Sequence, residues 1–474
     1  MKTRTKWQVP LLLLSIFAAC ILSACGSKDG VEQPPEPEEG VLIYAALNPV
    51  TDDFTRSVKK FNNAHEDVQI EVRDYSDEHG VERLFAELAL GQVPDIMEMH
   101  RLGEGANKDA AWSDMPYRER PADEYWLPYR QMAQKGYLEN LWPYIENDPQ
   151  LGLEGVLMPP LKAAEVNGGL YMIFPDVSIT TLMGPEHIVG SRLGWTLDEL
   201  METYSTMPED STILRYNATR WDVFSTLCAP LLEQYVNMET GESSFDSEGF
   251  RDMVEFLKSF PEECKTAGSS EEVRAELLDR ILGGRQMLET VTVAAMWYIA
   301  SLDTYWGAPS AYVGYPTADG SLGSFFNLHG NQLAMSSSCR DKETAWEFMR
   351  PILTKTYRDS EMLEMRKYVT IKTCVNLKNY NQGNEIDLAY NRGISDVGAG
   401  PLGERLFKPE EPNESHLQRF EALLNNTAQI YWPDSTLSDI VWDTLGPYFA
   451  GDKAMDEVIG LVQNRVQLYL NENR

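Results

Sequence analysis

Four short stretches of the sequence place a tryptophan or tyrosine directly beside other aromatic or polar side chains. They are Arg220-Trp221-Asp222, Met296-Trp297-Tyr298, Tyr305-Trp306 and Tyr431-Trp432-Pro433-Asp434. An aromatic ring can stack on the apolar C–H face of a sugar, while planar polar groups bond the sugar hydroxyls in fixed directions. The pattern therefore favours a mono- or oligosaccharide ligand over an ion or an amino acid.

Sequence patterns of common catalytic and metal sites are absent. There is no nucleophile elbow of the GxSxG type, no HExxH pair and no EF-hand loop, and the six histidines are scattered. A glycosidase needs two carboxylates roughly 5–10 Å apart. Any chain with 73 acidic residues contains candidates for such a pair. The acidic residues therefore do not distinguish a glycosidase from a binding protein. We expect a binding protein without metal or cofactor, with an exported carbohydrate-active enzyme as the alternative.

The elements that would position a site begin with alternating strands and helices. Apolar and β-branched runs predict strands at 41–47 and 68–72, and a third strand follows Gly91-Gln92-Val93-Pro94-Asp95. Apolar residues at helical spacing predict a helix in each interval. This order is typical of a doubly wound α/β lobe, whose parallel strands end at one edge. The strand-end residues expected to converge there are Asn48, Pro49, Tyr75, Met99 and His100.

A second series of elements starts after residue 175. Thr196-Leu197-Asp198-Glu199 is a capping box that opens a helix. Strands are predicted at 294–299 and 311–314, and a helix from about 455 to 470 ends the chain. Between the two series, residues 101–128 predict a long surface excursion that is rich in aromatic residues.

The beginning of the chain has the order of a secretory signal. Basic residues precede an apolar run, Leu11–Ile21, that is short for a membrane span. Leu22-Ser23-Ala24-Cys25 resembles a bacterial lipobox, which implies cleavage before Cys25 and a lipid on its sulfur. The alternative is an ordinary signal peptide with an incidental cysteine. Residues 26–40 are rich in Pro, Glu and Gly and predict a flexible tether. The protein would then be lipid-anchored on the extracytoplasmic face of the cell membrane.

Charge and cysteine usage limit the partners further. The 474 residues carry a net charge of −32, which argues against nucleic acid and against adsorption of the folded body to anionic lipid. Four cysteines beyond the lipobox, Cys228, Cys264, Cys339 and Cys374, form no CxxC pair. We expect buried thiols, although an exported chain also permits a disulfide.

Several stretches occur in the order and spacing of one family. The chain resembles the extracellular solute-binding lipoproteins of ABC transporters, in the carbohydrate-type family 1 branch related to maltose-binding protein. The resemblance rests on the lipobox and on Gly91–Asp95, Gly136–Leu141, Asn167–Pro175, Trp195–Leu200, Val313–Gly320, Ala345–Phe348, Ala450–Glu457 and Gln463–Val466. These stretches extend over nearly the whole mature chain.

The resemblance implies a periplasmic-binding-protein-like fold of type II, in which a hinge of three chain crossings joins two doubly wound α/β lobes. The crossings are expected near Pro175-Asp176, Ala311-Tyr312 and Ser337-Ser338. The lobes are expected to be 41–175 plus 311–338, and 176–310 plus 339–474.

The implied function is capture of a solute by lobe closure and its delivery to the permease subunits of an ABC transporter. We expect a monomer. A sensor subunit that reports ligand occupancy to a membrane receptor uses the same fold and is a further alternative.

The expected ligand-binding residues come from strand ends, the hinge and the aromatic stretches. They are Asn48, Met99, His100, Arg101, Trp126, Asp176, Arg220, Trp221, Asp222, Trp297, Tyr298, Trp306 and Trp432. Core packing is the alternative for each tryptophan, and a rim or core position is the alternative for His100. Asp176 could instead be a hinge hydrogen-bonding group. Related chains are usually shorter at 101–128, so the excursion is expected to set this pocket apart.

Overall fold

The computed structural model describes residues 39–77, 79–101, 125–214, 219–237, 240–262, 279–356, 373–389, 411–431 and 435–472. The chain forms two compact units. The first contains the described residues up to Asp176 together with His329–Thr356 and Cys374–Lys378. The second contains Val177–Leu328, Thr373 and the described residues from Asn379 onward.

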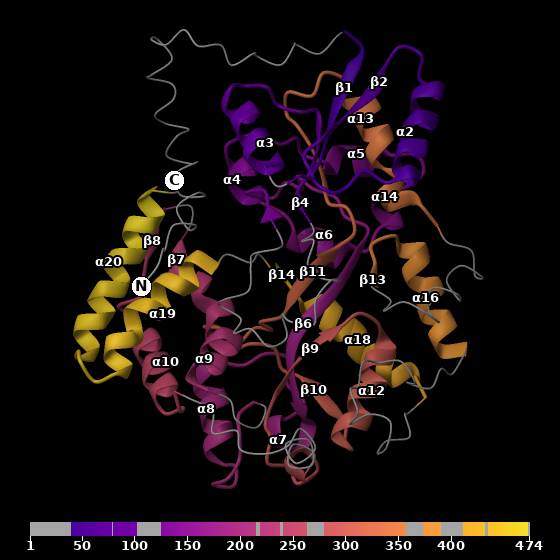
Figure 1. The fold of residues 1–474 in the computed structure, drawn as a ribbon. Coiled ribbons are helices and arrows are strands. Elements are labelled where there is room, and N and C mark those ends of the chain that lie inside the picture. Colours follow the sequence, from indigo (N-terminus) through magenta and orange to yellow (C-terminus); the bar gives the residue numbers. More distant parts are fainter. Residues whose placement is uncertain are drawn as a thin grey trace, which may run out of the picture. The chain divides into compact units, whose positions relative to one another are not determined.

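The first unit is built on a four-stranded sheet with the order β12-β3-β1-β2. Its strands are β1 (Val41–Ala46), β2 (Gln69–Asp74), β3 (Ile96–Glu98) and β12 (Leu333–Met335). β1 runs parallel to β2 and β3, whereas β12 is antiparallel to β3. Helices α2 (Asp52–Ala64) and α3 (Gly80–Ala89) connect the first three strands (Figure 1). The predicted strand–helix–strand–helix–strand order is confirmed.

Smaller elements complete this unit. β4 (His100–Arg101) and β5 (Tyr125–Trp126) form an antiparallel pair. The helices are α4 (Tyr129–Gln134), α5 (Trp142–Asn147), α6 (Met158–Ala163), α13 (Lys342–Met349) and α14 (Pro351–Thr354), with a 3-10 turn at Leu153–Gly155.

The second unit is built on a mixed sheet whose main path is β10-β6-β11-β14, with β9 and β13 also paired to β6. The strands are β6 (Asp176–Pro185), β9 (Glu289–Val293), β10 (Ser310–Tyr312), β11 (Phe325–His329), β13 (Thr373–Cys374) and β14 (Gln429–Ile430). A separate short pair is formed by β7 (Val236–Asn237) and β8 (Glu242–Ser243).

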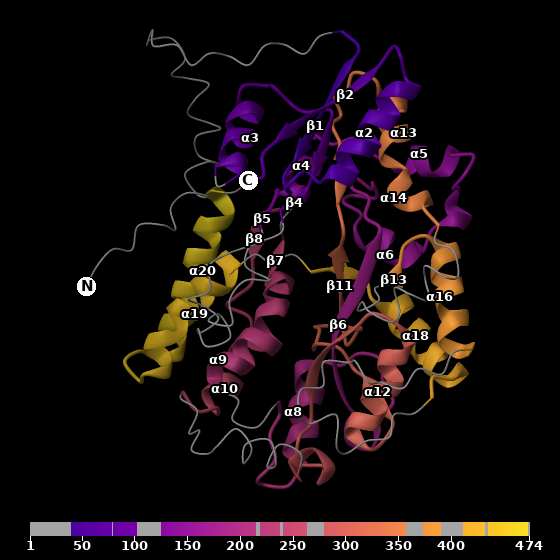
Figure 2. The same ribbon diagram turned by 45° about the vertical axis from the view of Figure 1, so that its right-hand side comes forward.

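Helices cover both faces of this sheet (Figure 2). One side carries α8 (Leu197–Ser205), α9 (Arg220–Val223), α10 (Glu248–Lys258), α19 (Ser435–Phe449) and α20 (Met455–Glu472). The other side carries α12 (Met296–Trp306) and α18 (Glu414–Asn426). The remaining helical elements are α7 (Glu186–Val189), a π-helical turn (Phe224–Cys228), a 3-10 stretch (Ala229–Tyr235) and α16 (Leu377–Ala389). The main core, around Trp195, Phe224 and Phe250, lies under the first group.

Of two secondary-structure predictions for the second unit, the structure confirms one and corrects the other. The capping box is present, with Thr196 accepting from the Glu199 backbone at the start of α8. The predicted strand at 294–299 is wrong, because the strand is β9 and helix α12 begins at Met296. Met296, Ile299 and Ala300 are buried at helical spacing, and a short apolar run does not distinguish a buried strand from a buried helix.

The chain passes from the first unit to the second between Asp176 and Val177 and returns between Leu328 and His329. The crossings predicted near Ala311-Tyr312 and Ser337-Ser338 are wrong. Tyr312 pairs with Met183 in the second sheet, whereas Ser337 N–H donates to Tyr137 O in the first unit. Residues 311–328 therefore belong to the second unit and 339–356 to the first, because long-range pairing rather than local sequence decides which sheet a strand joins.

None of the described helices is both long and apolar enough to cross a membrane.

Asp95 links two strands of the first sheet at the start of β3 and is 2% exposed. Its carboxylate accepts the Ile43 N–H at 2.7 Å and the Arg340 N–H at 3.0 Å, and it also pairs with the Arg340 guanidinium. We predict that Asp95→Ala lowers the free energy of unfolding by about 3 kcal/mol, because it leaves these donors without an acceptor. Urea unfolding measures this change. Asp53→Ala is the control, since its pair with Arg56 is exposed and should leave the urea midpoint nearly unchanged.

Candidate ligand-binding surfaces

The first candidate surface lies at the carboxyl ends of β1 and β3. Glu98 is the last residue of β3, and its Oε2 accepts the backbone N–H groups of Leu47 and Asn48, each at 2.8 Å. Asn48 Nδ2 donates to the same oxygen at 2.9 Å and to His100 O at 2.8 Å. Tyr44 Oη donates to Glu98 Oε1 at 2.7 Å. The structure thus brings Asn48 and His100 together around a carboxylate that was not among the expected site residues.

Glu98 is a buried carboxylate, 4% exposed. Burial raises the pKa of Glu98 above its ordinary value, while the bonds from Tyr44 and Asn48 act in the opposite direction. Burial also raises the pKa of Tyr44. One signal could have identified Glu98 in the sequence: it is a single acid between Met97 and Met99, at the end of a strand that is otherwise apolar.

The other residues of this unit that were expected to bind ligand differ in how far they are buried. Met99 is fully buried and belongs to the core. His100 is also buried, and its strand pairs it with Trp126, as Arg101 is paired with Tyr125. Asp176 is half-buried at the start of β6.

Tyr75 does not face the expected rim. It is buried, and its hydroxyl donates to Glu87 on α3 at 2.6 Å.

The second candidate surface is a row of uncharged polar side chains on three neighbouring strands. Asn327 Nδ2 on β11 donates to Thr180 Oγ1 on β6 at 2.7 Å, and it lies 3.4 Å from Ser178 Oγ. Thr180 Oγ1 is 3.2 Å from Thr292 Oγ1 on β9, its partner in the register. Ser178 is buried, Thr180 and Asn327 are half-buried, and Thr292 is exposed. We call Ser178, Thr180, Thr292 and Asn327 the polar row.

The polar row continues a face that is apolar further along the strands. Leu182 follows Thr180 by two residues, and Phe325 precedes Asn327 by two; both belong to the main core. Side chains two residues apart on a strand share a face, so this face changes from apolar to polar toward one end of the strands. The hydroxyl and amide groups there can donate and accept hydrogen bonds without carrying charge.

Tyr431 supplies an aromatic ring at this end of the sheet. Its backbone N–H donates to Phe326 O at 2.9 Å, and its ring lies 6.2 Å from that of Phe325 between centroids. Because β11 and β14 are parallel with Phe326 opposite Ile430, Asn327 and Tyr431 are the next residues in line. Tyr431 is 39% exposed. Sequence reasoning found the stretch that holds Tyr431 but missed Thr180, Thr292 and Asn327, whose types are ordinary in strands; Trp432 lies outside the described residues.

The expected aromatic residues fall into two groups. Trp306 is 4% exposed and is part of the core. Trp221 is half-buried and contacts Trp442, with 4.8 Å between ring centroids. Trp297 and Tyr298 are half-buried in the first turn of α12, with ring centroids 3.9 Å apart. The three half-buried rings retain surface for a ligand, whereas Trp306 is largely enclosed.

Arg220 and Asp222 are engaged in local structure. Arg220 donates to Leu257 O at 3.2 Å and to Phe260 O at 3.0 Å, which holds the end of α10. Asp222 accepts the Thr219 N–H at 2.7 Å and completes the capping box of α9.

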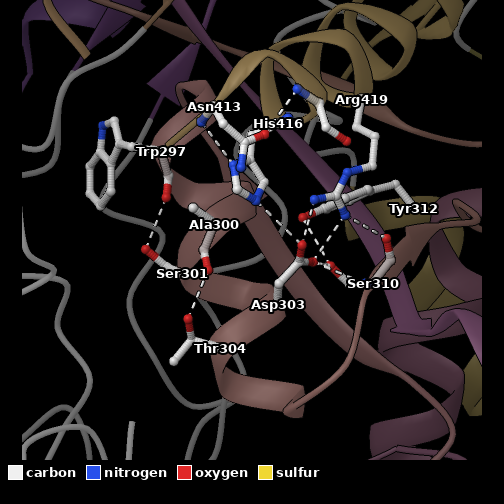
Figure 3. A network of polar contacts seen from close by, with 11 residues as sticks. Trp297, Ala300, Ser301, Asp303, Thr304, Ser310, Tyr312, Asn413, His416 and Arg419 are labelled. Atoms are coloured by element: carbon white, nitrogen blue, oxygen red, sulfur yellow. Dashed lines mark hydrogen bonds and ion pairs between the residues drawn. The ribbon is translucent and has the colours of Figure 1, made fainter. Parts of the chain in front are cut away.

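A network of polar contacts joins α12, β10 and α18 around the buried Asp303 (Figure 3). Asp303 accepts from the Ser310 N–H at 2.9 Å and from the Ser310 hydroxyl, and it pairs with both terminal nitrogens of Arg419. Asn413 N–H donates to His416 Nδ1 at 3.0 Å, so the neutral ring carries its proton on Nε2, 3.6 Å from Asp303. Ser310 bonds Asp303 rather than His416, so the order of contacts is not that of a nucleophilic triad.

Metal-binding and thiol groups complete the inventory of the described residues. Within the described ranges, no group of three or more His, Cys, Asp or Glu side chains is placed to hold a metal ion. Cys228, Cys339 and Cys374 are buried thiols rather than disulfide partners, and Cys264 lies outside these ranges.

Comparison with known proteins gives matches among solved structures. The periplasmic oligogalacturonide-binding protein from Yersinia enterocolitica aligns over 92% of this chain and 100% of its own, with 14% identity and a TM-score of 0.51. The chain has the fold of this binding protein. The predicted fold class, periplasmic-binding-protein-like with α/β lobes, is thereby confirmed.

Two further structures are similar at lower scores. The sugar-binding protein MalE from Xanthomonas citri covers 92% of this chain and 98% of its own, with 12% identity and a TM-score of 0.47. A de novo designed cysteine esterase covers 92% and 99%, with 13% identity and a TM-score of 0.49. A scan against protein-family models and a search of curated proteins found no match.

The Asp303 network predicts a measurable contribution to stability. We expect Asp303→Asn to lower the free energy of unfolding by about 3 kcal/mol, because the half-buried Arg419 loses its buried anionic partner. Urea unfolding measures the change, with Asp279→Asn as the control because Asp279 pairs with Arg285 at the surface. Equal midpoints for Asp303→Asn and the wild type would contradict the prediction.

Proposed function

We propose that the protein is a solute-binding protein that captures a mono- or oligosaccharide and delivers it to the permease subunits of an ABC transporter. The observation that carries this proposal is the polar row Ser178, Thr180, Thr292 and Asn327 beside the exposed ring of Tyr431. Hydroxyl and amide groups bond sugar hydroxyls, and an aromatic ring stacks on the C–H face of a sugar. The fold shared with the oligogalacturonide-binding protein supports binding rather than catalysis.

The ligand proposed is a neutral sugar rather than an anionic one. Every side chain of the polar row is uncharged, and the net charge of −32 repels polyanions at a distance. In the first unit the candidate ligand-binding residues are Asn48, His100, Arg101 and Trp126. In the second unit they are Trp221, Trp297, Tyr298 and Trp432. Asp176 stays a candidate at the start of β6.

A thermal-shift screen over neutral oligosaccharides, oligogalacturonides, peptides and metal ions tests the proposal. We expect a neutral sugar to raise the melting temperature, because a ligand at 100 times its Kd stabilises the folded state by about 2.7 kcal/mol. Asn327→Ala should reduce the shift by removing one end of the polar row. The matched control is Asn426→Ala, since Asn426 is exposed and donates to Ala422 O of its own helix, so this variant should keep the full shift.

Two outcomes of this screen would contradict the proposal. Stabilisation by peptides but by no sugar would overturn the carbohydrate assignment. Cleavage products after incubation with the stabilising oligosaccharide would identify a carbohydrate-active enzyme instead.

We also propose that a lipid on Cys25 anchors the protein to the extracytoplasmic face of the cell membrane. The support is the lipobox-like Leu22-Ser23-Ala24-Cys25 and the hydrophilic residues 26–40 that follow. A Cys25→Ala variant should be recovered from the medium, whereas the wild type should sediment with membranes. Equal membrane recovery of both, measured by immunoblot after fractionation, would exclude this anchor.

A further inference from the structure

Glu98 is a buried carboxylate, 4% exposed. In the part of the chain that the structure describes, no Lys or Arg side chain lies within ion-pair distance of it. Its compensation comes from Tyr44, Leu47 and Asn48 on the neighbouring strand and the turn that follows. Burying a charge without a counter-charge is costly even when it is hydrogen-bonded. Asp95, at the other end of the same strand, has the guanidinium of Arg340.

The bonds to Glu98 fix a single turn. Two backbone N–H groups and the side-chain amide of Asn48 all converge on Oε2. The same amide nitrogen donates to His100 O, so both the rotamer of Asn48 and the orientation of its amide are set. The turn continues through exposed Pro49 and Val50 to Thr51, which caps α2. One carboxylate therefore determines the conformation of the turn that follows β1.

We propose that Glu98 is a positioning residue that, in its ionised form, holds the turn at Asn48 in the conformation that meets the ligand. This inference rests on the proposed function, because it takes the strand ends of the first unit as a ligand-binding surface.

The neutral form of Glu98 would loosen this turn without removing it. A tyrosine hydroxyl both donates and accepts, so a proton on Oε1 can be shared with Tyr44 after that hydroxyl rotates. Oε2 still faces the three N–H donors, but bonds to a charged acceptor are roughly twice as strong as those to a neutral one. Glu98→Gln reproduces this state, with its oxygen toward the turn and its amide nitrogen toward Tyr44.

The groups around Glu98 leave few other sources of pH dependence. Among the described residues, the titratable side chain that bonds Glu98 is Tyr44 on β1. His100 on β4 follows Glu98 by two residues, and β12 places Leu333 opposite Glu98. Helices α2 and α13 contribute Phe54 and Phe348, which contact the Tyr44 ring. A pH effect in the acidic range that disappears in Glu98→Gln therefore reports on Glu98.

Stability and positioning should depend on pH in opposite directions. Because burial raises the pKa of Glu98 in the fold, its contribution to stability is largest when it is protonated and is lost as pH rises through that pKa. The turn, by contrast, is held most firmly by the ionised form. If Glu98 had a merely structural role, the stability of the fold and the order of the turn would change with pH in the same direction.

The experiment compares wild type with Glu98→Gln by hydrogen exchange of peptides covering residues 44–51, by urea unfolding and by sugar titration. At neutral pH we expect about tenfold faster exchange at the turn and about tenfold weaker binding of the stabilising sugar, from the loss of charge-assisted bonds. The urea midpoint should not fall. As the pH drops through the raised pKa of Glu98, the exchange rate of the wild type, corrected for the intrinsic rate, should approach that of the variant. The sugar affinity of the wild type should approach that of the variant as well. Both quantities should stay constant with pH in the variant.

Glu87→Gln is the matched control, because Glu87 also accepts from a tyrosine hydroxyl, that of Tyr75, and belongs to the same unit but not to this turn. It should leave exchange at 44–51 and sugar affinity unchanged. Unchanged exchange in Glu98→Gln would overturn the inference, as would a fall in midpoint that accounts for the lost affinity. If the wild type binds no sugar, the proposed function fails, and the exchange comparison still decides whether Glu98 holds the turn.

Discussion

Two buried carboxylates, Asp95 directly before β3 and Glu98 as its last residue, bond the backbone of β1 and of the turn that follows it. Asp95 accepts the N–H of Ile43 at the start, and Glu98 accepts those of Leu47 and Asn48 beyond the end. Buried backbone donors that lie beyond the paired residues of two strands have no ladder partner and must be satisfied in another way. The two side chains meet that requirement, so the alignment of the central strands and the shape of the turn after β1 follow from the same pair of residues.

The charges of the two carboxylates, Asp95 and Glu98, are stabilised in different ways. Asp95 is neutralised by Arg340 and behaves as a structural ion pair. Among the described residues, Glu98 is compensated by hydrogen bonds and not by an ion pair, and burial raises its pKa. Burial of a carboxylate without a counter-charge is typical of functional sites, where geometry is maintained at some expense of stability. The contrast within one short strand is the reason to connect Glu98 with ligand binding rather than with folding.

In the second unit, the polar row contains no charged side chain, and several charged side chains are engaged elsewhere. One of the unit's buried carboxylates, Asp303, bonds Arg419 and Ser310, and Arg220 and Asp222 are occupied by helix ends. The polar row contains only hydroxyl and amide groups. A surface of this kind recognises hydroxyl-rich neutral ligands through direction rather than charge, which agrees with the half-buried rings elsewhere in the unit.

The sequence by itself determined the α/β class, the alternation in the first unit and the capping box at Thr196, because periodicity and capping are local properties. It also pointed to Asn48 and His100, since parallel strands must end together. Only the tertiary structure decided that Met99 and Trp306 are core residues, that 296–306 is a helix, and that residues 311–328 belong to the second unit. The partners of Glu98 and of the polar row likewise emerged only from the fold, because they lie about 50 to 150 positions away. Strand pairing sets contacts across such separations, so even the isolated acid in an apolar strand does not reveal which residues it bonds.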